Sequence, residues 1–248
     1  MQVSDDLYLG NMSRSRLLPA FQSAQDPTIN QGIGPMGRIA FYNIVPATKG
    51  AATLVALHAL SAGTPLPLHA GAGITAALAP DGSGKTVYQL DVPRALSFTS
   101  TVDLSAINVT VSGFDYYGQA VTQTLALGNN TTVNTLKAFA SVLSVVPDTT
   151  NAGTITGGTA DIFGLPFAIT DAGYIMPKWK SVLAQDGGTF VAAVTTDPNT
   201  AALGDVRGTY APSDSADGSK RLVVWMHLTA SQVGPNATVN SAIGVVPA

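Results

Sequence analysis

The stretch INVTVSGFDYYGQAVTQTLAL, residues 107–127, alternates apolar and polar side chains on both sides of a glycine-bounded centre. A period of two is typical of strands with one buried face. A short loop bounded by glycines commonly joins two antiparallel strands. The stretch therefore predicts a β-hairpin with its apolar side chains on one face: Ile107, Val109 and Val111 before the loop, and Val121, Leu125 and Leu127 after it.

Similar short β-rich segments occur along most of the chain. Short segments rich in β-branched and aromatic residues alternate with Gly- and Pro-rich turns, and helical periodicity is almost absent. This pattern predicts an all-β fold, an antiparallel β-sandwich or jelly-roll-like domain over residues 38–248. We expect strands at residues 38–45, 53–60, 86–92, 94–100, 107–112, 119–127, 136–146, 154–156, 160–163, 166–170, 174–180, 189–196 and 221–229. Residues 62–82 read as a connection and 197–220 as a long polar loop, and a subdivision near 170–188 is left open.

Residues 1–37 read as an extended N-terminal arm, because prolines and glycines interrupt them repeatedly. Leu17, Leu18 and Phe21 bring apolar side chains close together there. We expect the arm to drape over a neighbouring subunit or over its own sheet; a frayed terminus is the alternative.

Composition narrows the functional classes. Only 11% of the 248 residues are charged, and the formal net charge is −3. A surface poor in charge suits a subunit held against other subunits better than a lone monomer. The chain has no basic run that would neutralise nucleic-acid phosphates. It has no cysteine, so neither a disulfide nor a thiolate metal site can form. Its first residues lack the basic start and apolar run typical of a secretory signal. No apolar stretch is long enough to span a membrane. We therefore expect synthesis in a reducing cytoplasm, with neither nucleic acid nor membrane as partner.

The segment Asp81-Gly-Ser-Gly-Lys-Thr86 resembles a phosphate-binding loop, but Ala79 occupies the position where that motif requires its first glycine. The segment also leads into a β-rich stretch, whereas a phosphate loop opens a helix. We interpret it as a surface turn.

No catalytic or metal-binding pattern stands out. His58, His69 and His227 lack a neighbouring acidic cluster, and no nucleophile elbow occurs. Every acidic residue is an aspartate. The candidates for a pair of catalytic carboxylates of the glycosidase type are Asp115, Asp161, Asp171, Asp186 and Asp205. Most of them lie beside turn residues, where aspartate commonly caps backbone amides. We expect no enzyme activity, no cofactor and no bound metal.

Several segments, in order, resemble a group of tailed-bacteriophage virion proteins known as head decoration or cement proteins. The resemblance covers roughly residues 85–168 and is carried by VYQLDVPR (87–94), VTVSGFDYYGQ (109–119), KAFASV (137–142) and DIFGLP (161–166). It implies an all-β protein on the outer surface of the head in the virion. There it would bridge capsomers and stabilise the DNA-filled head, with the major capsid protein and further copies of itself, as a dimer or trimer, as partners.

We expect the interface of such a protein to use clustered aromatic and apolar side chains. The candidates are Leu17, Leu18 and Phe21 in the arm, Phe114, Tyr116 and Tyr117 in the hairpin turn, and Trp179. One alternative is a tail or fibre component that binds host-surface glycans through stacking on Tyr116, Tyr117 and Trp179. A hydrolase of the cell envelope is a third hypothesis.

Overall fold

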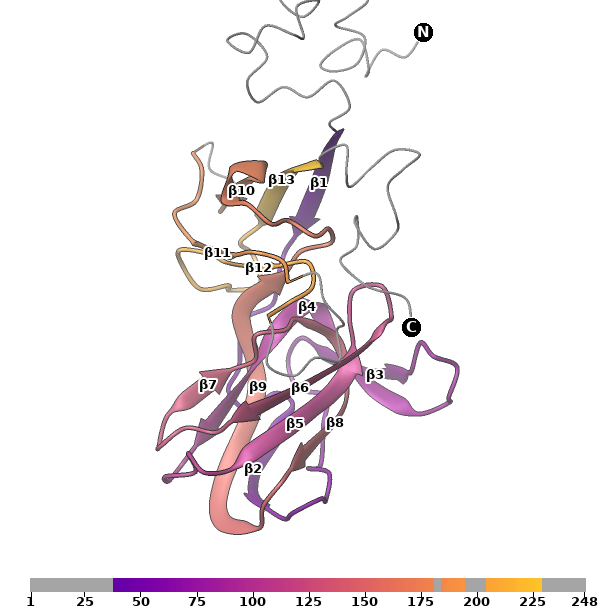
Figure 1. The fold of residues 1–248 in the computed structure, drawn as a ribbon, viewed down its shortest axis with the longest axis vertical. Helices are drawn as coiled ribbons and strands as arrows, with labels where there is room; N and C mark the ends of the chain where they lie inside the picture. The colour runs from indigo at the N-terminus through magenta and orange to yellow at the C-terminus, as the bar shows by residue number, and fades with distance from the viewer. Residues whose placement is uncertain (1–37, 181–183, 195–203, 229–248) are drawn as a thin grey trace, which may run out of the picture.

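A computed structural model of the chain describes residues 38–180, 184–194 and 204–228 (Figure 1). The predicted arm, residues 1–37, lies outside the described residues. All strand pairs in the described part are antiparallel, and the one helical element is a single 3₁₀ turn, η2, at Ala172–Tyr174. The prediction of an all-β antiparallel fold is therefore confirmed.

The described part of the chain contains thirteen strands. They are β1 (Arg38–Ile44), β2 (Val55–Leu60), β3 (Ile74–Leu78), β4 (Thr86–Ser100), β5 (Asn108–Phe114), β6 (Ala120–Ala126), β7 (Thr132–Asn134), β8 (Phe139–Pro147), β9 (Asn151–Gly164), β10 (Ile175–Trp179), β11 (Thr189–Val191), β12 (Thr209–Ala211) and β13 (Leu222–Leu228).

The predicted hairpin is present as β5 and β6, paired from Asn108 opposite Ala126 to Phe114 opposite Ala120. Val109 and Val111 are fully buried, as their spacing predicts. The two strands belong to a large curled sheet with the order β11-β12-β9-β4-β8-β5-β6; β2 pairs with β9, and β3 and β7 pair with β4 (Figure 1). The sheet curls around a hydrophobic cluster that includes Leu96, Phe98 and Phe139.

The expectation that Pro93 separates two strands is wrong, because β4 runs from Thr86 to Ser100 without interruption. Proline cannot donate a ladder hydrogen bond, so it is tolerated where the ladder is irregular. The pairing of β4 with β8 shifts register between Gln89 and Arg94, which includes the position of Pro93. The strand therefore changes partners at its proline and continues.

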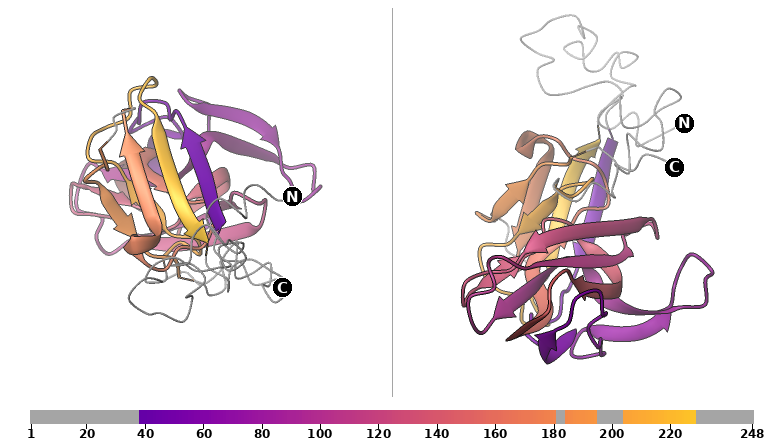
Figure 2. Two further views of the ribbon diagram at one scale, coloured as in Figure 1. Left: turned by 90° about the horizontal axis from the view of Figure 1, so that it is seen from above. Right: turned by 60° about the horizontal axis from the view of Figure 1, so that its bottom comes forward.

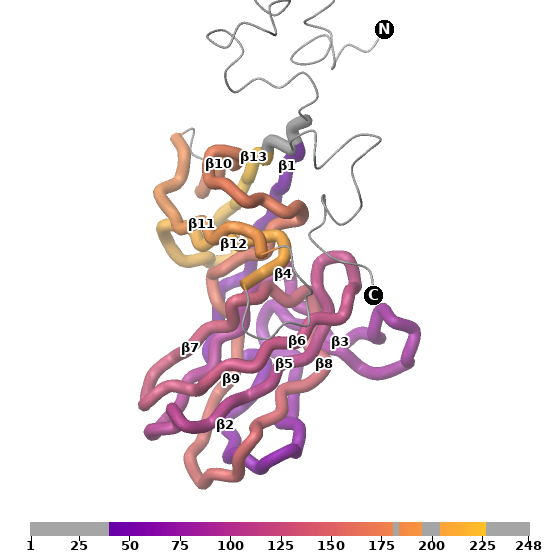
Figure 3. Tube along the Cα trace, viewed as in Figure 1, coloured from indigo at the N-terminus to yellow at the C-terminus, as the bar shows by residue number. Residues whose placement is uncertain are grey.

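The two short strands expected at 154–156 and 160–163 form one long strand, β9, which Figure 3 shows as a continuous tube through the height of the larger sheet. The glycines between them are not a break. A Cβ on Gly158 would lie 1.7 Å from the carbonyl oxygen of Gly50, and a Cβ on Gly157 would lie 3.0 Å from Phe98. Glycine is needed here because another segment crosses the strand at backbone distance.

Three further expectations need correction. Residues 62–82 contain strand β3, which forms a hairpin with the start of β4. Residues 166–170 are not a strand, although the backbone N–H of Ile169 donates to Arg207 O at 3.2 Å. Within the described part of 197–220, residues 204–211 contain β12 and the buried residues Asp205, Arg207 and Tyr210, so this portion is structured core; residues 212–220 form a mostly exposed polar loop, as expected.

A second, three-stranded sheet has the order β1-β13-β10 and lies at the upper end in Figure 1. Figure 2 shows its three strands side by side when the molecule is seen from above. Its inner face packs on the larger sheet through a second cluster that includes Tyr42, Trp179 and Val224 from the small sheet and Phe163 and Tyr210 from the large one. Residues 170–188, where the sequence allows a domain subdivision, contain β10 of the small sheet, which lies between β9 and β11 of the large sheet along the chain.

Candidate assembly surface

The outer face of the three-stranded sheet carries a row of large apolar side chains. Phe41 of β1 lies opposite Trp225 of β13, and Met176 of β10 lies opposite Trp225 from the other side. Their exposed fractions are 60%, 44% and 47%, in the order Phe41, Trp225, Met176. The Phe41 and Trp225 rings meet edge to face, with centroids 5.8 Å apart and planes at 73°. We call these three side chains the aromatic row.

Strand alternation explains why this row points outward. The neighbouring residues Tyr42, Ile175 and Val224 are buried in the second cluster, so the intervening residues must face the other side of the sheet. The next row on the outer face consists of Asn43, Val223 and Lys178. The aromatic row is thus an apolar strip with the polar side chains of Asn43 and Lys178 beside it. Contiguous exposed apolar surface of this kind is typical of contact sites between proteins.

The turn between β5 and β6 presents two more aromatic side chains. Tyr116 and Tyr117 are 43% and 39% exposed, and their rings meet edge to face with centroids 4.9 Å apart. Tyr116 also contacts Tyr42 of β1, with centroids 6.4 Å apart, so the turn touches the small sheet. The Tyr117 hydroxyl donates to the carbonyl oxygen of Pro166 at 2.9 Å, and partial burial raises its pKa. Both rings therefore have partners inside the chain while keeping an exposed edge.

A buried ion pair holds this turn in place. Asp115 and Arg207 are both almost fully buried, and Arg207 Nη1 donates to Asp115 Oδ2 at 2.9 Å. The other carboxylate oxygen accepts from the backbone N–H of Tyr117 at 2.9 Å and of Gln119 at 2.8 Å. Arg207 Nε donates to Leu165 O at 3.1 Å, and its guanidinium lies over the Tyr117 ring, 5.5 Å from the centroid. The pair ties the hairpin turn to the segments beside β9 and β12.

Asp205 extends this network toward β8. Its carboxylate accepts from the backbone N–H of Ala138 and of Arg207, both at 2.9 Å. Burial raises the pKa of Asp205, while the nearby positive charges of Arg207 and Lys137 act in the opposite direction. Lys137 is itself buried and donates to Gly204 O at 3.4 Å. The cluster fixes residues 204–207, which the sequence placed in a polar loop.

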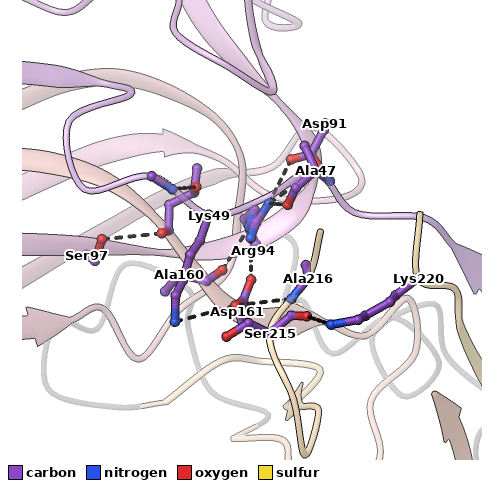
Figure 4. A network of polar contacts seen from close by, with 12 residues as sticks. Ala47, Lys49, Asp91, Arg94, Ser97, Ala160, Asp161, Ser215, Ala216 and Lys220 are labelled. Carbon is purple, nitrogen blue, oxygen red and sulfur yellow. Dashed lines mark hydrogen bonds and ion pairs between the residues drawn. The ribbon is translucent and has the colours of Figure 1, made fainter. Parts of the chain in front are cut away.

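A second buried arginine braces the junction of β4 and β9 (Figure 4). Arg94 is fully buried and donates to the carbonyl oxygens of Ala160 at 2.8 Å and Ala47 at 3.1 Å. Its Nη2 donates to Asp161 Oδ1 at 2.9 Å, and its Nη1 lies 3.3 Å from Asp91 Oδ1. The guanidinium also lies over the Phe163 ring of the second cluster, 5.2 Å from the centroid. Several of the chain's few charged side chains therefore form contacts inside the protein.

The predicted interface residues fall into three groups. Leu17, Leu18 and Phe21 lie outside the described residues. Tyr116 and Tyr117 are at the surface. Phe114 and Trp179 are only 5% and 1% exposed, so the expectation that they face a second subunit or a sugar is wrong: Phe114 packs against Ala79 and Val87, and Trp179 packs in the second cluster.

Sequence reasoning missed the aromatic row. Apolar residues fall on both faces of the segments 222–228 and 38–44, so their periodicity does not say which side chains face out. The register of the small sheet supplies that information, since it places Phe41, Trp225 and Met176 in one line.

The segment at 81–86 is a surface turn between β3 and β4, as expected. Gly82 and Gly84 have φ angles of 73° and 71°, a region that favours glycine. The Asp81 carboxylate accepts from the backbone N–H of Ser83 at 2.9 Å. The Ser83 side chain and this N–H together lower the Asp81 pKa. Thr86 then begins strand β4 rather than a helix.

Neither a metal-binding cluster nor a membrane-spanning helix is found in the part of the chain that the structure describes. No group of three or more His, Cys, Asp or Glu side chains there could hold a metal ion. No helix among those residues has the length and apolar character needed to cross a bilayer.

Comparisons with known proteins were negative: no family model matches the chain, and neither a curated protein nor a solved structure matches it.

Proposed function

We propose that this chain is a virion structural protein, a decoration or cement protein on the outer surface of a tailed-bacteriophage head. In that role it contacts the major capsid protein and further copies of itself, as a dimer or trimer, and stabilises the filled head. The proposal is carried by the aromatic row of Phe41, Trp225 and Met176, which exposes a contiguous apolar surface on a charge-poor chain. The ordered series of segments resembling decoration proteins, which includes the hairpin turn, supports the same class.

The aromatic row is suited to act as the contact surface. Aromatic and methionine side chains are enriched at the centre of protein interfaces, and a few of them carry most of the binding energy. The row sits on a sheet whose inner face is packed on the larger sheet, so little ordering is needed on binding. Repetition over a symmetric shell then allows modest contacts to give high total avidity.

The size of each contribution follows from the exposed area. A tryptophan side chain offers up to about 250 Å², so the 44% exposed fraction of Trp225 leaves roughly 110 Å² to bury. At about 25 cal/mol per Å², its complete burial contributes about 2.7 kcal/mol, or roughly 100-fold in the dissociation constant. This is the largest effect expected of Trp225→Ala at one contact.

The test is binding to purified empty heads that lack the protein, measured by co-sedimentation over a concentration series. We expect the wild-type chain to bind, and Trp225→Ala and Phe41→Ser to bind at least tenfold more weakly with little change in melting temperature. Leu57→Ala is the matched control, because Leu57 is 61% exposed on β2, which pairs with residues 151–157 of β9, whereas the small sheet packs on Phe163 near the other end of that strand. Failure of the wild-type chain to bind heads, or equal weakening by the control, would contradict the proposal.

A further inference from the structure

A groove of about 570 Å³ lies on the outer face of β4, between β7 and β9. Ser97 and Thr99 form its floor, because the alternating residues Leu96 and Phe98 are fully buried on the other side of the sheet. The segment that carries Lys49 and Ala51 also lines the groove. Its volume falls within the range of roughly 300–1,000 Å³ typical of small-molecule sites.

The lining is dominated by neutral hydrogen-bonding side chains. Ser97, Thr99, Thr132, Asn134 and Thr159 line the groove, and no aromatic side chain does. The Thr99 and Thr132 hydroxyls bond each other at 2.7 Å, which leaves each with further acceptor capacity. Asn134 lines the groove, is exposed, and makes no side-chain hydrogen bond within the described residues, so its carboxamide is available to a ligand.

The charged groups at the end of the groove balance one another. Asp161 accepts from the buried Arg94 at 2.9 Å and lies 3.6 Å from Lys49, while Asp91 is the second carboxylate beside Arg94. Two positive and two negative groups leave no net charge to attract an ion. Buried Arg94 also holds the Asp161 carboxylate in a fixed position. The Asp161 side chain still has 11% of its surface exposed. A carboxylate held in this way is a strong acceptor for hydroxyl groups.

We infer that this groove binds a neutral polyhydroxylated ligand, a carbohydrate. Ser97 and Thr159 are buried, so the groups that a sugar ring can reach are the Thr99 and Thr132 hydroxyls, one carboxamide and one fixed carboxylate. They offer both donors and acceptors to sugar hydroxyls, and the balanced charge disfavours ionic ligands. Without an aromatic platform for the ring, a single site binds weakly, and repeated copies would supply the avidity. The inference stands on the groove alone and does not depend on a head location.

The test is an amide NMR titration with the neutral sugars glucose, galactose and N-acetylglucosamine, alongside the anionic N-acetylneuraminic acid and the cationic glucosamine. We expect at least one neutral sugar to give saturable shifts at residues 97, 99, 132 and 134, with a dissociation constant on the order of 1–10 mM. N-acetylglucosamine should bind more tightly than glucosamine. Immobilised neutral glycans, compared with the free sugars, distinguish a surface glycan from a soluble one.

Variants locate the binding. Asn134→Ala and Thr99→Val should each weaken the binding of the responding sugar about tenfold. Thr110→Val is the matched control, because Thr110 forms the same kind of hydroxyl pair with Thr124, at 2.9 Å, outside the groove. The inference is wrong if no neutral sugar gives saturable shifts, if a charged sugar binds more tightly than the neutral ones, or if the groove variants bind no differently from Thr110→Val.

Discussion

Replacing Asp115 tests the buried ionic contact that joins the hairpin turn to the segment before β12. Asp115→Ala removes the carboxylate that lies 2.9 Å from Arg207 Nη1. It also removes the acceptor of the backbone N–H groups of Tyr117 and Gln119. Asp115→Asn is the milder change, since a side-chain oxygen remains for the two N–H groups while the charge is lost.

The magnitude follows from burial. Removing one member of a buried ion pair destabilises a protein by about 3–5 kcal/mol, and the Asp115 and Arg207 side chains are 1% and 2% exposed. Each lost backbone hydrogen bond adds roughly 1 kcal/mol, although the losses overlap because the groups touch. We expect Asp115→Ala to lower the free energy of unfolding by about 4–5 kcal/mol and Asp115→Asn by about 2–3 kcal/mol. Since domains have a total of about 5–15 kcal/mol, the Asn variant is the safer one to measure.

The assay is equilibrium unfolding in urea, with Asp103→Asn as control. Asp103 is exposed and accepts from the backbone N–H and the hydroxyl of Ser105, so its replacement should cost less than about 1 kcal/mol. Combining Asp115→Asn with Arg207→Met should cost at least about 1.5 kcal/mol less than the sum of the two single changes. Strict additivity, or an Asp115→Asn effect no larger than that of the control, would refute the reasoning.

Three further predictions concern other parts of the molecule. Gly158→Ala should lower the free energy of unfolding by about 1–3 kcal/mol, because its Cβ would lie 1.7 Å from Gly50 O; an unchanged melting temperature would show that the two segments do not approach so closely. Hydrogen bonds from the N–H groups of Ser219 and Lys220 lower the pKa of Asp217 to about 2. A carboxyl whose pKa is depressed by folding stabilises the fold above its unfolded pKa of about 3.9, and that stabilisation is lost as pH falls toward 2. Exchange of the Ser219 and Lys220 amides, corrected for intrinsic rates, should therefore accelerate over this interval, and constant protection would contradict the assignment. Deletion of residues 1–24 should leave the melting temperature nearly unchanged but weaken binding to heads, whereas equal binding would argue against a tethering role for Leu17, Leu18 and Phe21.

Local patterning was enough to predict the fold class and the central hairpin, because a period of two reports directly on one buried face. Aromatic clustering in the turn predicts that Phe114 contacts a neighbour, whereas Phe114 ends strand β5 and is buried. The pairing of β5 with β8 shifts register between Ser112 and Gly113, so alternation fails there and both Gly113 and Phe114 are buried. A register shift depends on the partner strand and leaves no signal in the strand's own sequence.

The buried charges show a similar limit. The sequence predicts only half of the role of Asp115. One carboxylate oxygen accepts from N–H groups of the turn, as expected of a turn former. The other oxygen binds Arg207, 92 residues away along the chain. Local sequence cannot reveal such a partner, and for the same reason residues 204–211 read as part of the polar loop expected at 197–220. The aromatic row is also a product of register between distant strands.

The most direct test of the central claim is a reconstruction of the intact phage particle at a resolution that traces this chain. The account predicts the chain on the outside of the head, with Phe41, Trp225 and Met176 buried against the major capsid protein or another copy of the chain. A particle without the chain, or a bound chain whose aromatic row faces solvent, would contradict it.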